Sequence, residues 1–200
     1  MQDNSKSSPI SFTIVRHGKV KANFPMFCTS KEFDEYMDYY DKADIYPIGK
    51  EYLRSPDEAL YISTLRRTRL TAAGLFGEEA AEAATPLEMA VEVPMRSFMD
   101  LNIPLPTIIW TMMARIQWFY DSDRQFETKK QTKARAEALI DLLESKQNTD
   151  YKKSCSLVSH GFFMLTLHRR LKRRGYKLKG IPRHSDEGYR NLQSFHASRL

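Results

Sequence analysis

Short apolar runs alternate along this sequence with longer segments whose apolar residues recur at helical spacing. The runs that predict strands are Ser11 to Val15, Ala59 to Ile62, Met89 to Val93 and Cys155 to Val158. The segments between them predict helices, so strand and helix follow one another through most of the chain. Such alternation is typical of folds in which helices cover both faces of a mostly parallel sheet. The sequence therefore predicts an α/β protein with three layers, α/β/α.

Five segments carry the helical pattern, and the rest of the chain holds few other signals. The predicted helices are Glu32 to Asp44, Leu65 to Phe76, Ile108 to Tyr120, Lys129 to Lys146 and Phe163 to Leu171. From Gly180 to Leu200 we expect irregular structure with one edge strand around Asn191 to His196. No repeat or low-complexity linker divides the chain, so residues 1–200 are expected to form a single domain. Residues 1–9 are expected to be flexible, and residues 97–128 to form a lid or cap insertion.

The composition is that of a folded protein without a membrane partner. The chain is 42% hydrophobic and 28% charged, which is far from the composition of disordered proteins. Its first ten residues are polar, and its apolar runs are too short or too broken by proline to span a bilayer. The two cysteines, Cys28 and Cys155, are isolated and are expected to be free thiols. Together these features predict a cytoplasmic protein.

The net charge of +6 is concentrated late in the chain, between His168 and Gly180. This basic segment has two interpretations. It is either a solvated helix face and loop, which we favour, or a field that attracts phosphorylated substrates or nucleic acid. No nucleic-acid-binding motif accompanies it, so a nucleic-acid partner is not expected.

Two histidines occur in matching contexts. His17 and His160 each follow an apolar run directly and precede a glycine. The carboxyl ends of parallel strands are where open α/β sheets bind their ligands, and glycine lets backbone approach a ligand closely. A single histidine in such a place is more often structural, but two in the same context indicate a site. His168, His184 and His196 lack this context and are expected to be structural.

Phosphoryl transfer needs cations around the phosphoryl oxygens and a nucleophile in line with the leaving group. Arg16 adjoins His17, and Arg67 begins the helix after the second predicted strand. A guanidinium suits this task because it stays charged and makes two parallel hydrogen bonds to phosphate. No histidines or cysteines stand at ligand spacing, so a metal site is not expected.

Three segments resemble the signature of the histidine phosphatase superfamily, which includes the phosphoglycerate mutases. Val15 to Gly18 resembles its RHG motif, and Val158 to Gly161 resembles its late strand with the second catalytic histidine. The third segment matches its SxLxRxxxTA pattern through Ser63, Leu65, Arg67, Thr71 and Ala72. The pattern singles out Arg67 rather than Arg66 or Arg69. Lys19 gives the first motif the RHGK form of one small bacterial branch.

The resemblance implies a phosphoglycerate mutase-like fold and a mechanism without cofactor or metal. His17 would be the nucleophile and form a phosphohistidine, while Arg16, Arg67, His160 and Gly161 would hold the phosphoryl group of a small-molecule substrate. A neutral imidazole is needed for attack, and the ordinary pKa of histidine makes that form available near neutral pH.

The resemblance also implies an acid that protonates the leaving group. Its candidates beyond the third predicted strand are Glu88, Glu92 and Asp100. Aligning the prolines of the RHGK branch with Pro104 and Pro106 favours Asp100, whose alternative role is a helix or turn cap. Lys19 and Asn23 are candidates for substrate contacts, although Lys19 is equally well explained as a solvated loop residue.

The leading hypothesis is a metal-independent phosphatase acting on a phosphomonoester. One alternative is a phosphomutase of the same superfamily, in which the phosphoryl group returns to a substrate. Another is a binding protein that keeps the phosphate pocket without turnover. The aromatic segment that contains Trp110, Trp118, Phe119 and Tyr120, together with Phe24, Phe27 and Cys28, is expected to serve mostly in core packing, with a lid or pocket rim as the alternative.

Overall fold

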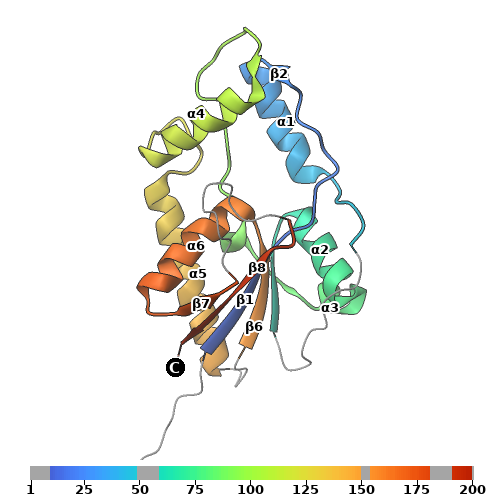
Figure 1. Cartoon of the computed structure of the whole chain (residues 1–200), viewed down its shortest axis with the longest axis vertical. Coiled ribbons are helices and arrows are strands. Elements are labelled where there is room, and N and C mark those ends of the chain that lie inside the picture. Colours follow the sequence, from blue (N-terminus) through green and yellow to red (C-terminus); the bar gives the residue numbers. More distant parts are fainter. Residues whose placement is uncertain (1–9, 49–58, 150–153, 181–190, 200) are drawn as a thin grey trace, which may run out of the picture.

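A six-stranded sheet forms the centre of the protein, with helices on both of its faces (Figure 1). The computed structural model describes residues 10–48, 59–149, 154–180 and 191–199. The strand order is β4-β3-β6-β1-β8-β7. These strands are β1 (Ile10–Arg16), β3 (Ala59–Ser63), β4 (Thr85–Leu87), β6 (Ser154–Ser159), β7 (Lys177–Lys179) and β8 (Ser194–Arg199). The predicted α/β/α architecture with a mostly parallel sheet is confirmed.

Parallel pairing of the central strands brings their carboxyl ends to one edge of the sheet. β1 runs parallel to β6, with Arg16 opposite Ser159, and β3 runs parallel to β6, with Ile62 opposite Val158. β6 is buried from Cys155 to Ser159, and β1 buries Phe12, Ile14 and Val15, as expected for a sheet covered on both faces. The turns that follow β1, β3 and β6 therefore begin at the same level of the sheet.

Two pairs of helices cover the sheet. α5 (Lys129–Thr149) and α6 (Gly161–Arg173) lie on one face, and α2 (Arg66–Phe76) and α3 (Glu78–Glu82) lie on the other (Figure 1). The larger core, between the sheet and the α5/α6 pair, buries Ile14, Leu139, Leu157 and Phe163 completely. The smaller core, on the α2/α3 face, contains Ile62, Ala72 and Val158.

A smaller group of elements lies beyond the carboxyl edge of the sheet. It consists of β2 (Phe27–Cys28), α1 (Ser30–Lys42), β5 (Leu105–Pro106) and α4 (Thr107–Phe119), with β2 pairing to β5. A capping box begins α1, because the Thr29 hydroxyl accepts from the Glu32 N–H and the Glu32 carboxylate accepts from the Thr29 N–H. Trp110 of α4 packs on Phe33 of α1 and is fully buried, so α4 and α1 share a core of their own.

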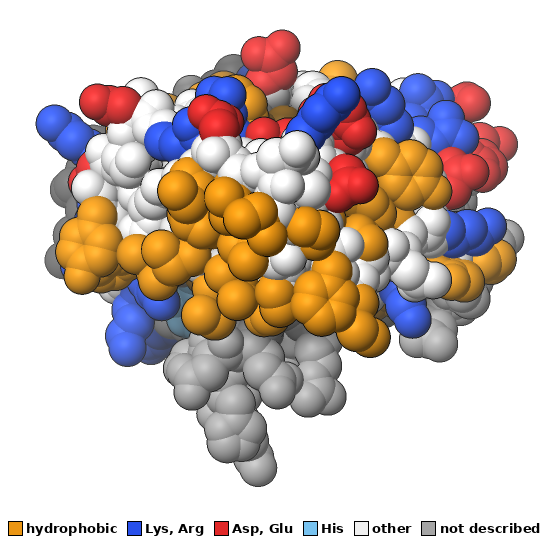
Figure 2. Space-filling view, turned by 90° about the horizontal axis from the view of Figure 1, so that it is seen from above, with side chains coloured by type: hydrophobic (Ala, Val, Ile, Leu, Met, Phe, Trp, Pro, Cys, Tyr) orange, Lys and Arg blue, Asp and Glu red, His pale blue; other side chains and the backbone are white. Residues whose placement is uncertain are grey.

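Many apolar side chains of these upper elements are exposed. Figure 2 shows the molecule from above, where hydrophobic side chains gather on the surface. On α4 the exposed residues Ile108, Met112, Ile116 and Phe119 follow one another at helical spacing. The sequence left two roles open for the aromatic segment, core packing or an exposed lid or rim. Trp110 and Trp118 pack in the core, whereas Phe119 and Tyr120 are exposed. The expected role of residues 97–128 as a lid stays a prediction.

The strand expected at Met89 to Val93 is wrong. The strand is β4, at Thr85–Leu87, and a 3-10 turn, η1 (Glu88–Ala90), follows it. Side chains bind the carbonyls of the following segment where a neighbouring strand would have done so. Arg135 donates to the carbonyls of Met89 and Val91, and the Ser159 hydroxyl donates to the carbonyl of Ala90.

The end of the chain is more regular than expected. The predicted edge strand lies further along, as β8, and it is not at an edge because it pairs antiparallel with both β1 and β7. β7 and α3 carry too short a pattern to be predicted from sequence. Residues 1–9 and His184 lie outside the described residues. Both cysteines are buried free thiols, as expected.

The basic segment is partly neutralised by α5. Arg170 binds the Glu137 carboxylate, and Arg174 binds Glu137 and Asp141. These ion pairs fit the interpretation of this segment as a solvated helix face.

Candidate active site

The strand ends place both catalytic candidates of the sequence side by side. His17 follows β1 and His160 follows β6, and their ring centroids lie 5.1 Å apart. The backbone continues the parallel pairing here, because the His17 N–H donates to the Ser159 carbonyl at 3.0 Å. Both side chains are buried, with exposed fractions of 2% and 0%. Two segments 143 residues apart in sequence therefore form one cluster.

The surroundings of His17 fix both its tautomer and its charge. Its Nδ1 lies 2.7 Å from the carbonyl oxygen of Gly18. Because a carbonyl only accepts, Nδ1 carries the proton, and the lone pair of the neutral ring is on Nε2. Burial, with the neighbouring charges of Arg67 and Arg16, lowers the pKa of His17 to about 3. The ring is therefore neutral at physiological pH, with Nε2 able to act as a nucleophile.

His160 is held between a serine and an arginine. Arg67 donates from Nε to His160 Nδ1 at 3.1 Å, so the neutral ring carries its proton on Nε2, which lies 2.7 Å from the Ser63 hydroxyl. Burial first, and then the charge of Arg67, places the pKa of His160 well below its ordinary value. Both ring nitrogens thus have a partner within the protein.

Arg67 is one of the largest fully buried side chains of the protein, with 1% of its surface exposed. Besides His160, it binds Asp41 of α1, with an Nη1 to Oδ1 distance of 2.8 Å. A guanidinium has five N–H groups, so these two contacts do not exhaust its donors. Asp41 is half exposed and compensates part of the buried charge. Arg67 is thereby fixed in orientation and keeps donors for an anion.

Arg16 reaches the same region from the end of β1. Its side chain can lie there because residue 161 is a glycine and has no side chain of its own. A Cβ atom on Gly161 would lie 2.9 Å from Arg16 Nε and 3.0 Å from its Cζ. Only glycine allows this approach, because real Cβ atoms do not come so close. Burial lowers the pKa of Arg16, while the negative charge of Glu92 opposes that change. The expected grouping of Arg16, His17, Arg67, His160 and Gly161 is therefore present.

Glu92 is the candidate acid that reaches this group. Its two carboxylate oxygens accept from the backbone N–H groups of Phe162 and Phe163, at 3.1 and 2.8 Å, in the first turn of α6. A carboxylate is favourable there because the N-terminal N–H groups of a helix have no partner within the helix. Glu92 thus lies against the turn that follows His160 and acts electrostatically on Arg16.

Asp100 lies elsewhere. Both of its oxygens bind the Arg124 guanidinium, at 3.1 and 2.6 Å, and its side chain is 83% exposed. The hydrogen bonds and charge of Arg124 lower the pKa of Asp100, with a smaller contribution from Arg96. None of the described interactions of Asp100 involves His17, His160, Arg16 or Arg67.

The two expected substrate contacts are exposed. Lys19 lies over the ring of Tyr46 at 5.4 Å, and Asn23 is on the segment between β1 and β2. Neither residue contacts the histidine pair in the described interactions, so their expected role stays a prediction.

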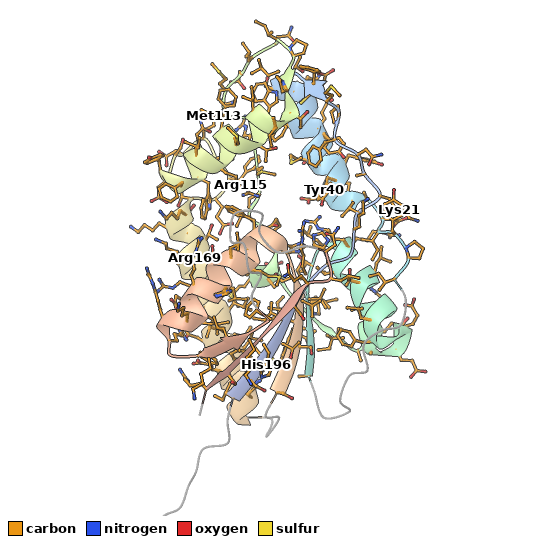
Figure 3. All side chains as sticks on the ribbon, in the orientation of Figure 1. Lys21, Tyr40, Met113, Arg115, Arg169 and His196 are labelled. Atoms are coloured by element: carbon orange, nitrogen blue, oxygen red, sulfur yellow. The ribbon has the colours of Figure 1, made fainter. Side chains whose placement is uncertain are left out.

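Three residues near the cluster were not singled out for a role from the sequence. Tyr40 of α1 lies under the Arg67 guanidinium, 5.2 Å from ring centroid to Cζ, and points toward the end of the sheet in Figure 3. Burial raises the pKa of its hydroxyl, while Arg67 and Arg16 oppose that change. Asp41 binds Arg67, and Ser63 binds His160. Ser63 belongs to the SxLxRxxxTA pattern, which was its only signal; Tyr40 and Asp41 lie on a helix face that sequence alone does not orient.

Within the described part of the chain, no three His, Cys, Asp or Glu side chains are grouped as metal ligands. Among the same residues, no helix combines the length and the apolar character needed to cross a membrane.

Comparison with known proteins identifies the pattern. A family model described as the histidine phosphatase superfamily (branch 1) matches residues 12–185. No curated protein matches the sequence. Among solved structures, mycobacterial glucosyl-3-phosphoglycerate phosphatase in its native form is 17% identical, with a TM-score of 0.55 over 95% of this chain and 90% of that chain.

Two further solved structures show a similar likeness. The VO3 complex of the same mycobacterial phosphatase is 16% identical, with a TM-score of 0.53 over 94% of this chain and 92% of that chain. Mycobacterial hydrolase 1 is 16% identical, with a TM-score of 0.54 over 95% and 92%. At such identities the likeness concerns the fold.

Proposed function

Since this chain belongs to the histidine phosphatase superfamily, we propose that it hydrolyses a phosphomonoester through a phosphohistidine on His17. The observation that carries the proposal is the hydrogen bond from His17 Nδ1 to the Gly18 carbonyl. It leaves the lone pair of a neutral ring on Nε2, beside two guanidinium groups. A buried imidazole in this tautomer, surrounded by fixed cations, is suited to attack a phosphorus atom.

The reaction has two displacements. Nε2 of His17 forms a bond to phosphorus as the bond from phosphorus to the ester oxygen breaks, and the leaving oxygen takes a proton. Water then attacks phosphorus and gives a proton to the carboxylate that protonated the leaving oxygen, the bond to Nε2 breaks, and inorganic phosphate leaves. Arg16 and Arg67 stabilise the charge on the equatorial oxygens in both steps. His160 orients Arg67 through the bond to its Nε, and it reaches a phosphoryl oxygen only by exchanging its contact with Ser63.

Of the three candidate proton donors, Glu88 is exposed at the start of η1, and the choice is between Glu92 and Asp100. The contacts favour Glu92, because its carboxyl group lies against the turn after His160 and acts on Arg16, whereas Asp100 is bound to Arg124. The proton donor matters most for esters with poor leaving groups. Glu92→Gln is therefore expected to slow an alkyl phosphate far more than p-nitrophenyl phosphate, and Asp100→Asn to slow neither selectively. The reverse pattern would assign the acid to Asp100.

The proposal is tested by turnover and by trapping the intermediate. Wild-type protein is expected to release phosphate from p-nitrophenyl phosphate, and denaturation at alkaline pH during turnover, which preserves the acid-labile N–P bond, should leave a phosphoryl group on the peptide that contains His17. His17→Asn should lower kcat by more than about a thousandfold, as loss of a nucleophile does in other enzymes. His168→Asn is the matched control and should keep full activity. The Arg67→Ala variant should lose phosphatase activity. The Arg66→Ala variant, changed at the neighbouring exposed position, should keep it.

The outcome also distinguishes hydrolysis from the phosphomutase and binding-protein alternatives. A phosphatase releases inorganic phosphate in proportion to substrate consumed, whereas a mutase returns the phosphoryl group to an organic acceptor. A stable phosphohistidine without phosphate release would favour the mutase. Saturable binding of vanadate without turnover of any phosphomonoester in a broad panel would favour the binding protein.

A further inference from the structure

A cavity of about 610 Å³ lies between α4 and α6, separate from the histidine pair. Its walls come from residues 111–120 and from residues 162–169. This volume is within the range of small-molecule sites, roughly 300–1,000 Å³. None of the residues assigned above to phosphoryl transfer lines this α4–α6 pocket. It is therefore a second concave site whose occupant the proposed reaction does not explain.

The lining of the pocket is mostly apolar. Ile116 and Trp118 of α4 face Phe162 and Leu165 of α6 across it. Trp118 also packs edge-on against Phe162, with ring centroids 4.8 Å apart, so two aromatic rings in contact form part of the pocket lining. Covering an apolar wall of this kind with a hydrocarbon lowers the free energy, in proportion to the apolar area removed from water.

The charged residues that line the pocket all have one sign. Arg115 and Arg169 are among its lining residues, and no Asp or Glu is. Figure 3 labels these two arginines, which reach the pocket from α4 and α6 respectively. Arg169 is exposed, so its guanidinium is free to move toward a ligand at the rim. The pocket therefore combines an apolar interior with a cationic border.

Arg115 is the more buried of the two cations. Its guanidinium lies 3.7 Å from the centroid of the Phe162 ring, and its Nη1 donates to the Val93 carbonyl. Burial lowers the pKa of Arg115 to about 10, so it remains charged near neutral pH. Glu92 and Glu127 act on it from outside the pocket and compensate part of that charge.

We infer that the α4–α6 pocket binds a single-chain anionic amphiphile, of the kind represented by a medium-chain fatty carboxylate. The hydrocarbon chain covers Ile116, Trp118 and Leu165, and the anionic head lies at the Arg169 border. The sign of the border excludes a cationic head, and its charge disfavours a neutral chain relative to an anionic one. The exposed apolar residues of α4 continue the same surface outward, which suits a chain longer than the pocket.

The pocket also borders the catalytic group through Phe162. The ring of this residue lines the pocket, and its N–H donates to Glu92 at 3.1 Å. An occupant that moves the ring therefore acts on the first turn of α6, directly after His160. Binding itself does not depend on the proposed hydrolysis, so the two proposals fail separately.

Binding is tested with dodecanoate below its micelle concentration, by calorimetry and by the fluorescence of Trp118. We expect one saturable site, with dodecanol and acetate binding at least about tenfold more weakly, because each lacks one of the two features that the pocket matches. Millimolar vanadate, which addresses the histidine pair, should not compete for this site, so dodecanoate should still bind with the same stoichiometry.

Two matched pairs of variants locate the site. Ile116→Asp places a carboxylate in the pocket wall and should weaken dodecanoate binding by about tenfold or more, whereas Ile108→Asp, on the same helix but outside the pocket, should not. Arg169→Gln should weaken it about two- to fivefold, the range for one exposed charge, and Arg173→Gln should not.

Three results would overturn the inference. The first is the absence of saturable binding by calorimetry, and the second is equal affinity for dodecanoate and dodecanol. The third is a dimer in sedimentation that Ile108→Asp and Ile116→Asp both dissociate, because the α4 surface would then be covered by a second copy of the chain.

Discussion

Protonation of His17 is expected to destabilise the folded protein in mild acid. Its pKa is lowered from 6.5 in an open chain to about 3 in the folded protein. As the pH falls below 6.5, the unfolded chain takes up a proton that the folded chain refuses, so stability is progressively lost down to about pH 3. Each pH unit in this window is worth about 1.4 kcal/mol. Between pH 7.5 and 4.5, His17 alone should remove about 2.7 kcal/mol from the free energy of unfolding.

Urea denaturation of wild-type protein and His17→Asn, in buffers without phosphate or sulfate, measures this contribution. Other groups that titrate in the same range affect both proteins, so the difference between the two pH dependences isolates His17. The wild type should lose about 2–3 kcal/mol more than the variant between pH 7.5 and 4.5. An NMR titration should show the His17 ring neutral throughout this range. Parallel pH dependences for the two proteins would refute the reasoning, because the burial of a neutral His17 would then carry no free energy.

Three further results are expected. Ser63→Ala removes the partner of His160 Nε2 and should lower kcat by about ten- to a hundredfold with a smaller change in KM, since a loosened ring no longer orients its neighbours; unchanged kcat would show that Ser63 is not needed for orientation. Gly161→Ala should displace Arg16 and weaken inhibition by vanadate by about tenfold, measured as Ki, while thermal unfolding shows whether the fold survives. Prolonged dialysis against EDTA should leave phosphatase activity intact; loss of activity that added zinc or magnesium restores would contradict metal-independent chemistry.

The central site was predictable because its signals are local. A buried strand, a histidine and a glycine occur together twice, and parallel strands end at one edge of a sheet, so His17 and His160 could be brought together without knowing the fold in detail. The spacing of the SxLxRxxxTA pattern selected Arg67 from three nearby arginines. The structure places all three residues in one buried cluster.

The rest of the site depends on contacts that local sequence does not encode. The proline alignment favours Asp100, and no local signal points to Glu92 instead, because its partners, the N–H groups of Phe162 and Phe163, lie 70 and 71 residues further along the chain. The prediction of a strand at Met89 to Val93 was wrong for a related reason. Its apolar pattern is real, but Arg135 and Ser159 take up its carbonyls and fold it into a turn.

The pairing of β1 with β8 has a consequence for how the protein is made. β1, the strand that His17 follows, is flanked on one side by β8, and Arg16 exchanges backbone hydrogen bonds with Leu192 and Gln193. Leu192 follows Arg16 by 176 residues, so the ribosome must add a long further stretch of chain after His17 before this partner can form. Contacts of such sequence separation slow folding, because a long loop must close before they form. β1 therefore lacks this flanking strand during most of translation, and the sheet next to the histidine pair is complete only once β8 is available.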